Sequence, residues 1–174
     1  MEEGNAIYTR RSVRAYDPSR RADDKQIKEV LSAAMSAPSA MNKRPWEFLV
    51  VTRSDLLGEI MKIHPYCSSL ADAGTAIIVC GDLNEEYKTQ FGGYHVYDCS
   101  AATENLLLRA KELGLDTCWC GIAPSTDRMD AFRKLFSMPE HIDPMALVIL
   151  GYAKDSPTRA EDRFEPSKVH FQRW

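Results

Sequence analysis

The sequence lacks both of the glycine-rich patterns that hold phosphate groups at a helix N-terminus, GxGxxG and GxxxxGK[ST]. Its one pair of adjacent glycines, Gly92-Gly93, lies in a polar stretch rather than between a strand and a helix. A phosphate group bound by this protein would therefore have to be held by side chains. Any cluster of cationic residues in the sequence gains interest for that reason.

Long hydrophobic runs and an excess of basic charge are also absent. No apolar run approaches the ~18–20 residues that cross a bilayer, and residues 1–20 lack the apolar stretch of a signal peptide. We therefore expect a cytoplasmic protein with no membrane partner. The net charge of −3, from 22 basic and 25 acidic residues, argues against a nucleic-acid partner, because such proteins are normally basic over a whole face.

The composition is that of a globular domain. The chain has 174 residues, of which 44% are hydrophobic and 27% charged, and it contains no internal repeat or low-complexity tract. Its five cysteines lack disulfide-type spacing, and Cys118 and Cys120 have no nearby CxxC or histidine partner that would complete a metal site. We expect one domain over residues 1–174, buried thiols and no metal.

Hydrophobic periodicity indicates alternating helices and strands. After Asp23 the apolar residues follow the i, i+3, i+4, i+7 spacing of one helix face, Asp23 or Asp24 can cap that helix, and Pro38 stops it. Helices are predicted over 23–37, 54–64, 94–113 and 125–138, and strands over 48–52, 75–80, 115–119 and 146–152. This alternation predicts an α+β fold of the α/β-type three-layer kind, with a central mixed β-sheet of four to five strands flanked by helices.

The C-terminal segment 153–174 has mixed charge and no clear period, yet it carries Val169, Phe171 and Trp174. A solvated tail rarely contains so much apolar surface. We therefore expect this segment to pack against another surface, such as that of a second subunit.

Cationic residues are concentrated near the N-terminus. Residues 9–21 include five arginines but a single acid, Asp17, and Arg10, Arg11 and Arg14 surround Ser12. A guanidinium group binds phosphate oxygens in a planar, bidentate way, and one such contact contributes about 1.5–3 kcal/mol when partly desolvated. The pattern predicts an arginine clamp for a phosphate group. Taken alone, it is equally consistent with a solvated basic stretch near a frayed terminus.

A second candidate element is the polar loop after the first predicted helix, which reads Ala-Pro-Ser-Ala-Met-Asn-Lys-Arg-Pro-Trp from residue 37. Ser39 and Asn42 present small polar groups, Pro45 stiffens the exit of the loop, and Trp46 anchors the strand that follows. Such a loop can offer amide and backbone groups to a planar heterocycle. By itself it is only a loop with an aromatic anchor.

Together these motifs resemble the FMN-dependent nitroreductase family. The match consists of Arg-Arg-Ser-x-Arg from residue 10, Ala-Pro-Ser-x-x-Asn-x-x-Pro-Trp from residue 37, Gly-Leu-Asp-Thr-Cys-Trp-Cys-Gly from residue 114, and a basic tail that closes on Trp174. The four motifs occur in order and span essentially the whole chain, which makes the resemblance specific.

The resemblance implies a nitroreductase-like homodimer with two FMN molecules at the subunit interface, in which the arm 153–174 wraps the partner. The residues that carry over by position to the phosphate of FMN are Arg10, Arg11, Ser12 and Arg14, with Arg159 and Arg163 as further candidates. Those that carry over to the isoalloxazine ring from the other subunit are Pro38, Ser39, Ala40 and Asn42. Those that would lie along the ring, with a backbone N–H near Gly121 directed toward flavin N5, are Trp119, Cys120, Gly121 and Ile122. Many members also supply polar contacts from the region of residues 65–69, but the sequence there identifies no particular residue.

The chemistry that the resemblance implies belongs to the cofactor. NADH or NADPH gives a hydride to flavin N5 and leaves, and a small-molecule acceptor such as a nitroaromatic or a quinone then takes two electrons in a ping-pong cycle. No catalytic side chain is therefore expected, and the four histidines are interpreted as surface or structural residues. Two alternatives stay open: a non-catalytic protein that stores FMN or senses redox state, and specialised flavin chemistry such as dehalogenation, flavin cleavage or azoline oxidation.

The interval between the second predicted strand and the long helix is short. Longer members of the family insert helical segments there that cover the substrate pocket, whereas residues 82–93 are few and polar. We therefore expect a short mobile lid over residues 83–94 and a comparatively open flavin.

Overall fold

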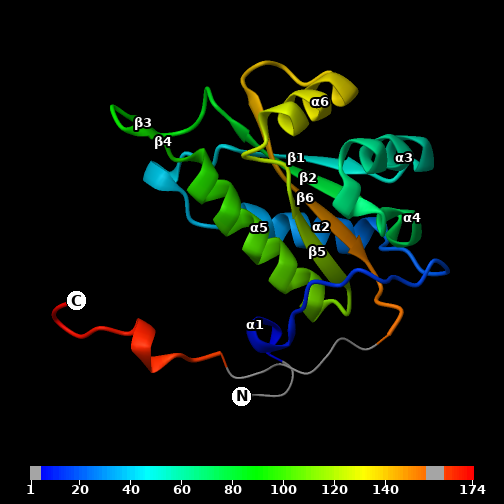
Figure 1. Cartoon of the computed structure of the whole chain (residues 1–174), viewed down its shortest axis with the longest axis horizontal. Helices are drawn as coiled ribbons and strands as arrows, with labels where there is room; N and C mark the ends of the chain where they lie inside the picture. The colour runs from blue at the N-terminus through cyan, green and yellow to red at the C-terminus, as the bar shows by residue number, and fades with distance from the viewer. Residues whose placement is uncertain (1–4, 156–162) are drawn as a thin grey trace.

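The computed structural model describes residues 5–155 and 163–174 (Figure 1). Its helices are α1 (Ala6–Thr9), α2 (Asp24–Met35), α3 (Ser54–Ile63), α4 (Leu70–Ala73), α5 (His95–Glu112) and α6 (Thr126–Phe136). Its strands are β1 (Trp46–Val51), β2 (Ala76–Asp82), β3 (Lys88–Thr89), β4 (Gly92–Gly93), β5 (Asp116–Gly121) and β6 (Ile142–Gly151). Short 3-10 helices occupy Ala40–Asn42, Pro65–Cys67 and Pro166–Lys168. In the described part of the chain, no helix combines the length and apolar character needed to cross a membrane.

Each predicted helix and strand is present, within a few residues of its predicted bounds. Helix α2 begins as the sequence indicated, because the Asp23 carboxylate accepts a hydrogen bond from the Gln26 N–H at 2.7 Å while the Gln26 side chain accepts one from the Asp23 N–H at 3.1 Å. Helices α1 and α4 and the β3–β4 hairpin were not predicted. They are too short to produce a periodic pattern.

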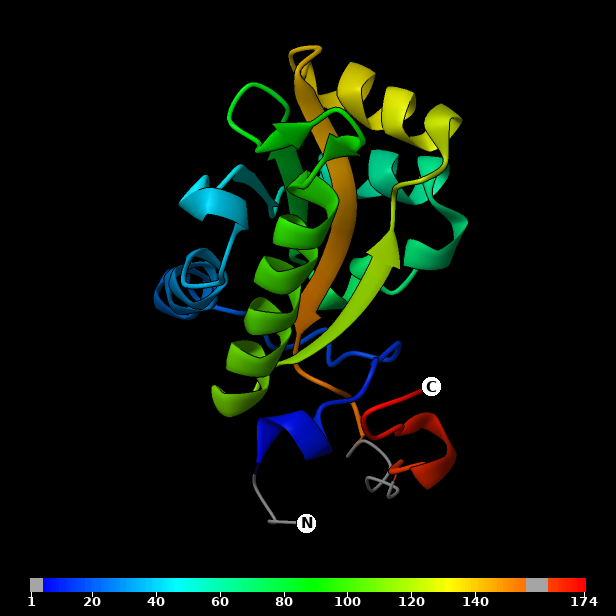
Figure 2. The same cartoon turned by 90° about the vertical axis from the view of Figure 1, so that its left-hand side faces the viewer.

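The α+β fold with helices around a central sheet is confirmed, and one detail of it is corrected. The four strands of the sheet lie in the order β1-β2-β6-β5, and each neighbouring pair is antiparallel, so the sheet is not mixed. Among the described residues, parallel pairing is limited to an isolated bridge between Ser12 and Thr117. For β5 and β6 the path of the chain accounts for this direction: α6 lies across one end of the sheet, so β6 enters at the end where β5 left (Figure 2).

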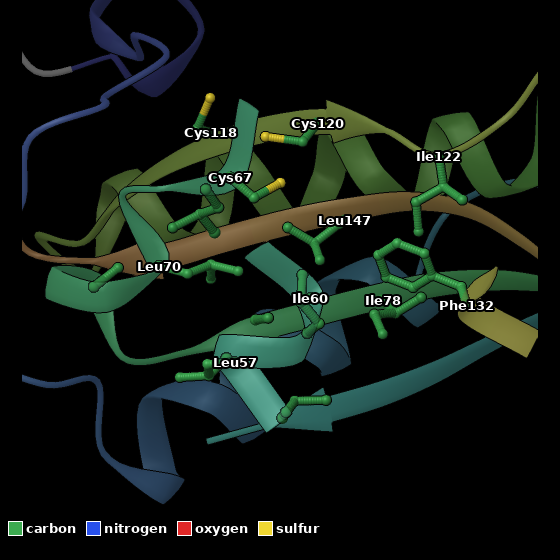
Figure 3. Packing of buried hydrophobic residues seen from close by; sticks show 14 of the residues in the cluster. Leu57, Ile60, Cys67, Leu70, Ile78, Cys118, Cys120, Ile122, Phe132 and Leu147 are labelled. Carbon is green, nitrogen blue, oxygen red and sulfur yellow. The ribbon is translucent and has the colours of Figure 1, made fainter. Parts of the chain in front are cut away.

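Helices cover both faces of the sheet (Figure 2). On one face, α2 and α5 pack against buried sheet residues that include Ile77 and Val148. On the other face, α3, α4 and α6 enclose a second cluster that includes Ile78 and Leu147 (Figure 3). Successive residues of a strand point to opposite faces, so the central strands β2 and β6 contribute to both clusters and join the three layers.

All five cysteines are buried and carry free thiols. Burial raises the pKa of Cys80 and of Cys99 to about 12. A thiol that resists ionisation is unreactive, so these residues pack as small apolar side chains, as expected.

The N-terminal arginine segment is attached to the sheet and is not frayed. The Val13 N–H donates to the Thr117 carbonyl and the Asp17 N–H donates to the Tyr152 carbonyl, each at 2.9 Å. Between them Tyr16 is buried, and its hydroxyl donates to the Val13 carbonyl at 2.9 Å. The backbone between Val13 and Asp17 therefore has a defined position along the edge of β5 and the end of β6.

The described part of the tail, residues 163–174, extends away from the sheet (Figure 1). Its apolar side chains are open to solvent, with Phe171 79% exposed and Trp174 wholly exposed. Within the tail, the His170 ring stacks on the Trp174 indole at 4.2 Å. Within the described residues of one chain, Phe171 and Trp174 therefore lack the packing surface that the sequence led us to expect.

Two glycine substitutions test this packing. At Gly151, a Cβ would lie 2.9 Å from Tyr16 Cδ1 and 3.2 Å from Ala73 Cα, whereas at Gly58, within α3, no atom lies within 4 Å of an added Cβ. Gly151→Ala should therefore lower the free energy of unfolding by about 1–3 kcal/mol through overpacking. Gly58→Ala should raise it by about 0.5–1 kcal/mol, because alanine favours the helix. Urea denaturation measures both, and equal effects of the two variants would contradict the packing described.

Candidate functional site

Strand β5 is an edge strand, and part of its outer edge is open. Its inner edge pairs with β6, while at its outer edge the Thr117 carbonyl accepts the hydrogen bond from Val13. Backbone groups alternate between the two edges of a strand, so those of Trp119 and Gly121 also face outward. Within the described residues, no turn or loop carbonyl outside the strands accepts a hydrogen bond from their two N–H groups. This stretch of backbone is able to hydrogen-bond a ligand.

The carbonyl of Gly121 is held by two side chains. His64 Nε2 lies 3.0 Å from this oxygen, and Arg128 Nη1 donates to it at 2.6 Å. His64 is only 1% exposed, and burial lowers the pKa of its imidazole, assisted by the positive charge of Arg128. A neutral imidazole that approaches a carbonyl through Nε2 must carry its proton there, so His64 and Arg128 both act as donors.

The predicted phosphate residues lie beside the open edge of β5, because Ser12 bridges Thr117. Ser12 and Arg14 are exposed, and Arg11 is half-buried. Arg10 Nε lies 3.5 Å from a carboxylate oxygen of Glu104 on α5. Arg11 and Arg14 donate to backbone carbonyls, and within residues 5–155 and 163–174 neither forms an ion pair with a carboxylate. Their positive charge is therefore available to an anionic group.

The predicted ring-binding loop has a strained backbone. Met41, Asn42 and Arg44 have φ values of 51°, 55° and 52°, in the left-handed region that non-glycine residues seldom adopt. Its polar side chains stabilise this conformation. Ser39 Oγ accepts from the Arg44 N–H at 2.9 Å, and Asn42 Oδ1 accepts from Arg44 Nε at 3.1 Å. Pro38 and Asn42 are exposed, and Ser39 and Ala40 are half-buried.

Asp98, in the first turn of α5, fastens this loop to the body of the protein. Its Oδ1 accepts a hydrogen bond from the Ala40 N–H at 2.9 Å, and the residue is only 5% exposed. Asp98 was not among the residues predicted from the sequence. Its position one helical turn before the buried Ala102, on the apolar face of a long helix, was the signal that could have identified it.

The two predicted halves of the site do not meet within one chain. The ring-binding loop leads into β1, and the arginine segment lies along β5, so they lie at opposite edges of the four-stranded sheet. Figure 2 shows the loop before β1 and the strand β5 on opposite sides of the sheet. A site that uses both elements would require two copies of the chain.

The side chains of the predicted segment 119–122 point in different directions. Trp119 is 37% exposed, whereas Cys120 and Ile122 are buried in the core on the α3 side of the sheet (Figure 3). Cys120 and Ile122 could therefore contact a ligand only through their backbone. On the α5 side, Trp119 and Gly121 line a cavity of about 590 Å³, within the size range of small-molecule sites, together with Ser100, Met129 and Met145.

His95, interpreted from the sequence as a surface or structural histidine, and Asp143, which was not predicted, also line this cavity. His95 Nδ1 lies 2.6 Å from Glu86 Oε2, and its Nε2 lies 3.2 Å from Asp143 Oδ2. Burial by itself raises the pKa of Glu86, but its hydrogen bonds with His95 hold that pKa below the usual value. Gly93 and Gly81 leave the space that Glu86 and His95 occupy. This cluster attaches the β3–β4 hairpin to α5 and β6.

Four buried side-chain atoms in the described residues lack a hydrogen bond: Arg10 Nε, His64 Nδ1, Asp98 Oδ2 and Arg128 Nε. Each belongs to a residue that contacts or forms one of the candidate elements. A buried polar atom without a partner costs about 1–3 kcal/mol, so such atoms are rare where stability alone is at stake. Their concentration here favours a functional site.

Two further sequence predictions concern the arm and the segment near residue 65. Arg163 is exposed, and Arg159 lies outside the described residues. In the segment 65–69, Tyr66 is 75% exposed and Cys67 is buried, and the described structure favours no residue there as a ligand contact.

The chain is thus an α+β protein in which an arginine-bearing segment lies beside the open edge of a strand, opposite a strained polar loop. The family model described as the Nitroreductase family matches residues 7–69 and 64–152. The chain therefore belongs to the nitroreductase family.

Relatives and solved structures agree with this assignment. A protein of Methanothermobacter thermautotrophicus with the provisional name NADH dehydrogenase/NAD(P)H nitroreductase is 42% identical over all of this chain and 88% of its own length. A crystal structure from Bacteroides thetaiotaomicron with the same provisional name has a TM-score of 0.89 at 36% identity, over 97% of this chain and 96% of that one. An FMN-dependent nitroreductase of Clostridium difficile shares the fold, with a TM-score of 0.86 at 24% identity over 98% and 99% of the two chains.

The lowered pKa of His64 makes stability depend on pH. Below its ordinary value of 6.5, the unfolded chain takes up a proton at His64 while the folded protein does not, so the free energy of unfolding should fall as pH falls. His64→Gln should remove this part of the loss. Urea denaturation at about pH 8 and about pH 5.5 measures it. The control is His170→Gln in the exposed tail, and a slope in His64→Gln as steep as in the wild type would contradict the burial of a neutral imidazole.

Proposed function

We infer that this protein is an FMN-dependent oxidoreductase that takes electrons from NADH or NADPH and passes them to a small acceptor. The observation that carries this proposal is the arginine segment held beside the open backbone of β5, since FMN combines a phosphate with a ring edge that forms hydrogen bonds. The names of the similar proteins, which include NAD(P)H nitroreductases, support the donor. The name of the Clostridium difficile structure supports the flavin. In this proposal the whole chain forms one FMN-binding domain.

The residues present fit the phosphate of FMN. Arg11 and Arg14 carry charges that no carboxylate neutralises within the described residues, and the exposed hydroxyl of Ser12 lies between them. Arg10 Nε is buried and lies 3.5 Å from a Glu104 carboxylate oxygen without a hydrogen bond, so a closer phosphate oxygen would complete its hydrogen bonding. We assign Arg10, Arg11, Ser12 and Arg14 to the phosphate, with Arg163 and Arg159 of the arm as candidates to join them.

The ring would lie between two copies of the chain. Along one side we assign the exposed Trp119 and the backbone of residues 119–122, with the Gly121 N–H as a donor toward N5. From the partner we assign the loop of Pro38, Ser39, Ala40 and Asn42. The separation of these elements to opposite sheet edges in one chain supports a homodimer.

Exposed apolar side chains give a second reason to propose a dimer. Ile7 on α1 and Tyr97 on α5 are 65% and 70% exposed, and the apolar residues of the tail lie open to solvent. Surface of this kind is typical of a subunit interface. In the proposed dimer, the arm 153–174 covers part of the partner.

The protein's own part in the reaction is to bind FMN and to receive the two reactants. FMN, when bound, supplies a group that accepts a hydride from a nicotinamide and passes two electrons to an acceptor such as a nitroaromatic or a quinone. The arginines anchor the phosphate, and the loop and β5 orient the ring. The cavity beside Trp119 and Gly121 receives the nicotinamide and then the acceptor in turn, which is a ping-pong order.

The visible spectrum of the purified protein tests this proposal directly. Bands near ~370 and ~450 nm should reveal bound flavin, and anaerobic NADH or NADPH should bleach them, with colour restored by an acceptor. A flavin that stays oxidised under an excess of both nucleotides would instead indicate a non-catalytic FMN-binding protein. A colourless protein that takes up no added FMN would reject both.

Loss of the arginine clamp should abolish flavin binding. Arg10→Ala combined with Arg14→Ala should purify colourless, because two phosphate contacts of about 1.5–3 kcal/mol each correspond to at least a hundredfold loss of affinity. The matched control is Arg53→Ala with Lys62→Ala, which removes two exposed cations of α3 and its N-terminus. Flavin content by absorbance measures the effect. Full flavin content in the Arg10/Arg14 variant would show that the segment is merely a charged surface.

The β3–β4 hairpin should affect the choice of acceptor rather than flavin binding. Its tip is exposed, with Phe91 90% exposed, while Glu86 at its base is fixed to His95. Deleting residues 88–93 should change the ratio of kcat/KM between a large quinone and a small nitroaromatic, with FMN content unchanged. Phe91→Ala, which retains the hairpin, is the control. Loss of FMN from the deletion variant would contradict the assignment as a lid.

A further inference from the structure

Gly121 occupies a position where the orientation of the backbone matters. Glycine has the widest backbone freedom of any residue, and Gly121 is the last residue of an edge strand, with a neighbouring strand on one side only. Beyond it the chain turns back, and the N–H groups of Ile122 and Ala123 both donate to the Met145 carbonyl. The Ile122 bond ties the peptide group that carries the Gly121 carbonyl to β6, whereas the Gly121 N–H belongs to the preceding peptide group. A restraint on the carbonyl therefore acts on the N–H through the φ and ψ angles of Gly121.

Two side chains from other elements add to the restraint that β6 provides. His64 lies at the junction of α3 and the 3-10 helix 65–67, where its backbone N–H donates to the Ile60 carbonyl at 2.9 Å. Arg128 lies in the first turns of α6. Their side chains meet at the Gly121 carbonyl, at 3.0 and 2.6 Å, and a carbonyl oxygen has two lone pairs to accept both.

The positions of His64 and Arg128 are unfavourable for the stability of the fold, because each leaves one side-chain nitrogen without a hydrogen bond. His64 Nδ1 and Arg128 Nε are both buried without a hydrogen bond. In addition, a guanidinium cation and an imidazole crowd the same acceptor, which disfavours protonation of the imidazole. Buried groups with unmet hydrogen bonds persist where their position serves another purpose.

We propose that His64 and Arg128 are positioning residues for the electron-transfer step. Their shared hydrogen bonds fix the Gly121 carbonyl, and through the φ and ψ angles of Gly121 they limit the directions open to its N–H beside flavin N5. The Arg128 cation favours the reduced, more negative flavin. This inference rests on the proposed function, because it requires FMN to lie along β5. It adds two residues, from α6 and from the end of α3, that do not themselves contact the ring.

Each residue has a distinct role in this arrangement. His64 is a neutral donor and contributes direction, so glutamine, whose Nε2 can also donate, should replace it better than leucine. Arg128 contributes both a hydrogen bond and a charge, and a nearby cation stabilises added negative charge. Lysine should therefore preserve more of its effect than glutamine.

The experiment compares FMN-loaded variants by spectroelectrochemical titration. Arg128→Gln should lower the midpoint potential by about 30 mV, which corresponds to a tenfold change in the equilibrium constant of a two-electron couple. Arg128→Lys should shift it less. Lys134→Gln, an exposed position of α6 that loses the same charge, should leave the potential unchanged.

Positioning by His64 is measured without turnover. In isotope-labelled protein, addition of FMN should shift the Gly121 amide proton resonance downfield in the wild type and in His64→Gln. In His64→Leu the shift should be lost, and FMN affinity should fall about tenfold, the effect of one hydrogen bond. If His64→Leu does not fold, the Gly121 amide shift on addition of FMN is compared among His64→Gln, Arg128→Lys and Arg128→Gln. This comparison still tests the shared restraint.

The outcomes separate this inference from the proposed function. Wild-type protein that binds no FMN overturns both. Wild-type protein that binds FMN and is reduced by NADH or NADPH supports the function. The inference alone is then overturned if Arg128→Gln and Lys134→Gln have the same midpoint potential. It is also overturned if addition of FMN leaves the Gly121 amide resonance of the wild type unmoved. A lowered potential in Arg128→Gln alone, with the amide shift present, supports it.

Discussion

The hydrogen bond from the Val13 N–H to the Thr117 carbonyl is the contact on which the candidate site depends. It joins the N-terminal segment to the outer edge of β5 and so places Arg10 to Arg14 beside the open backbone of Trp119 and Gly121. Tyr16, buried below the segment, prevents it from moving away. On a free chain end, the same arginines would lose far more conformational entropy on binding an anion. The sheet edge therefore turns a basic sequence into an ordered cationic surface.

The site also has a cost in stability. The strained backbone at Met41, Asn42 and Arg44 and the unsatisfied atoms of His64, Asp98 and Arg128 are each unfavourable for folding. They lie around the two elements that the family motifs identify, while the two cores on either side of the sheet are closely filled. Natural sequences commonly depart from locally optimal choices where function requires it, and the distribution of strain in this protein follows that pattern.

Much of the fold was predictable because its signals are local. Caps, proline stops and apolar periodicity depend on residues a few positions apart, and they located α2, α3, α5 and α6 and the four sheet strands. The antiparallel pairing of β5 with β6 was not predictable, since it depends on α6 lying across the sheet end. The motif at residues 119–122 was identified as a unit, yet Cys120 and Ile122 face the core (Figure 3), because alternate residues of β5 point to opposite faces. His64 and Arg128 carry no motif and come from distant parts of the chain.

The sequence by itself determined the class of this protein. Its ordered motifs identify the nitroreductase family, its cysteine spacing indicates buried thiols, and its lack of a glycine-rich loop assigns any phosphate to side chains. Only the tertiary structure decided where those motifs lie: the arginines on one edge of the sheet, the polar loop on the other, and the Gly121 carbonyl between two donors. The physical reason is that helix and strand formation depend on neighbouring residues, whereas edge position and shared hydrogen bonds depend on how the whole chain packs.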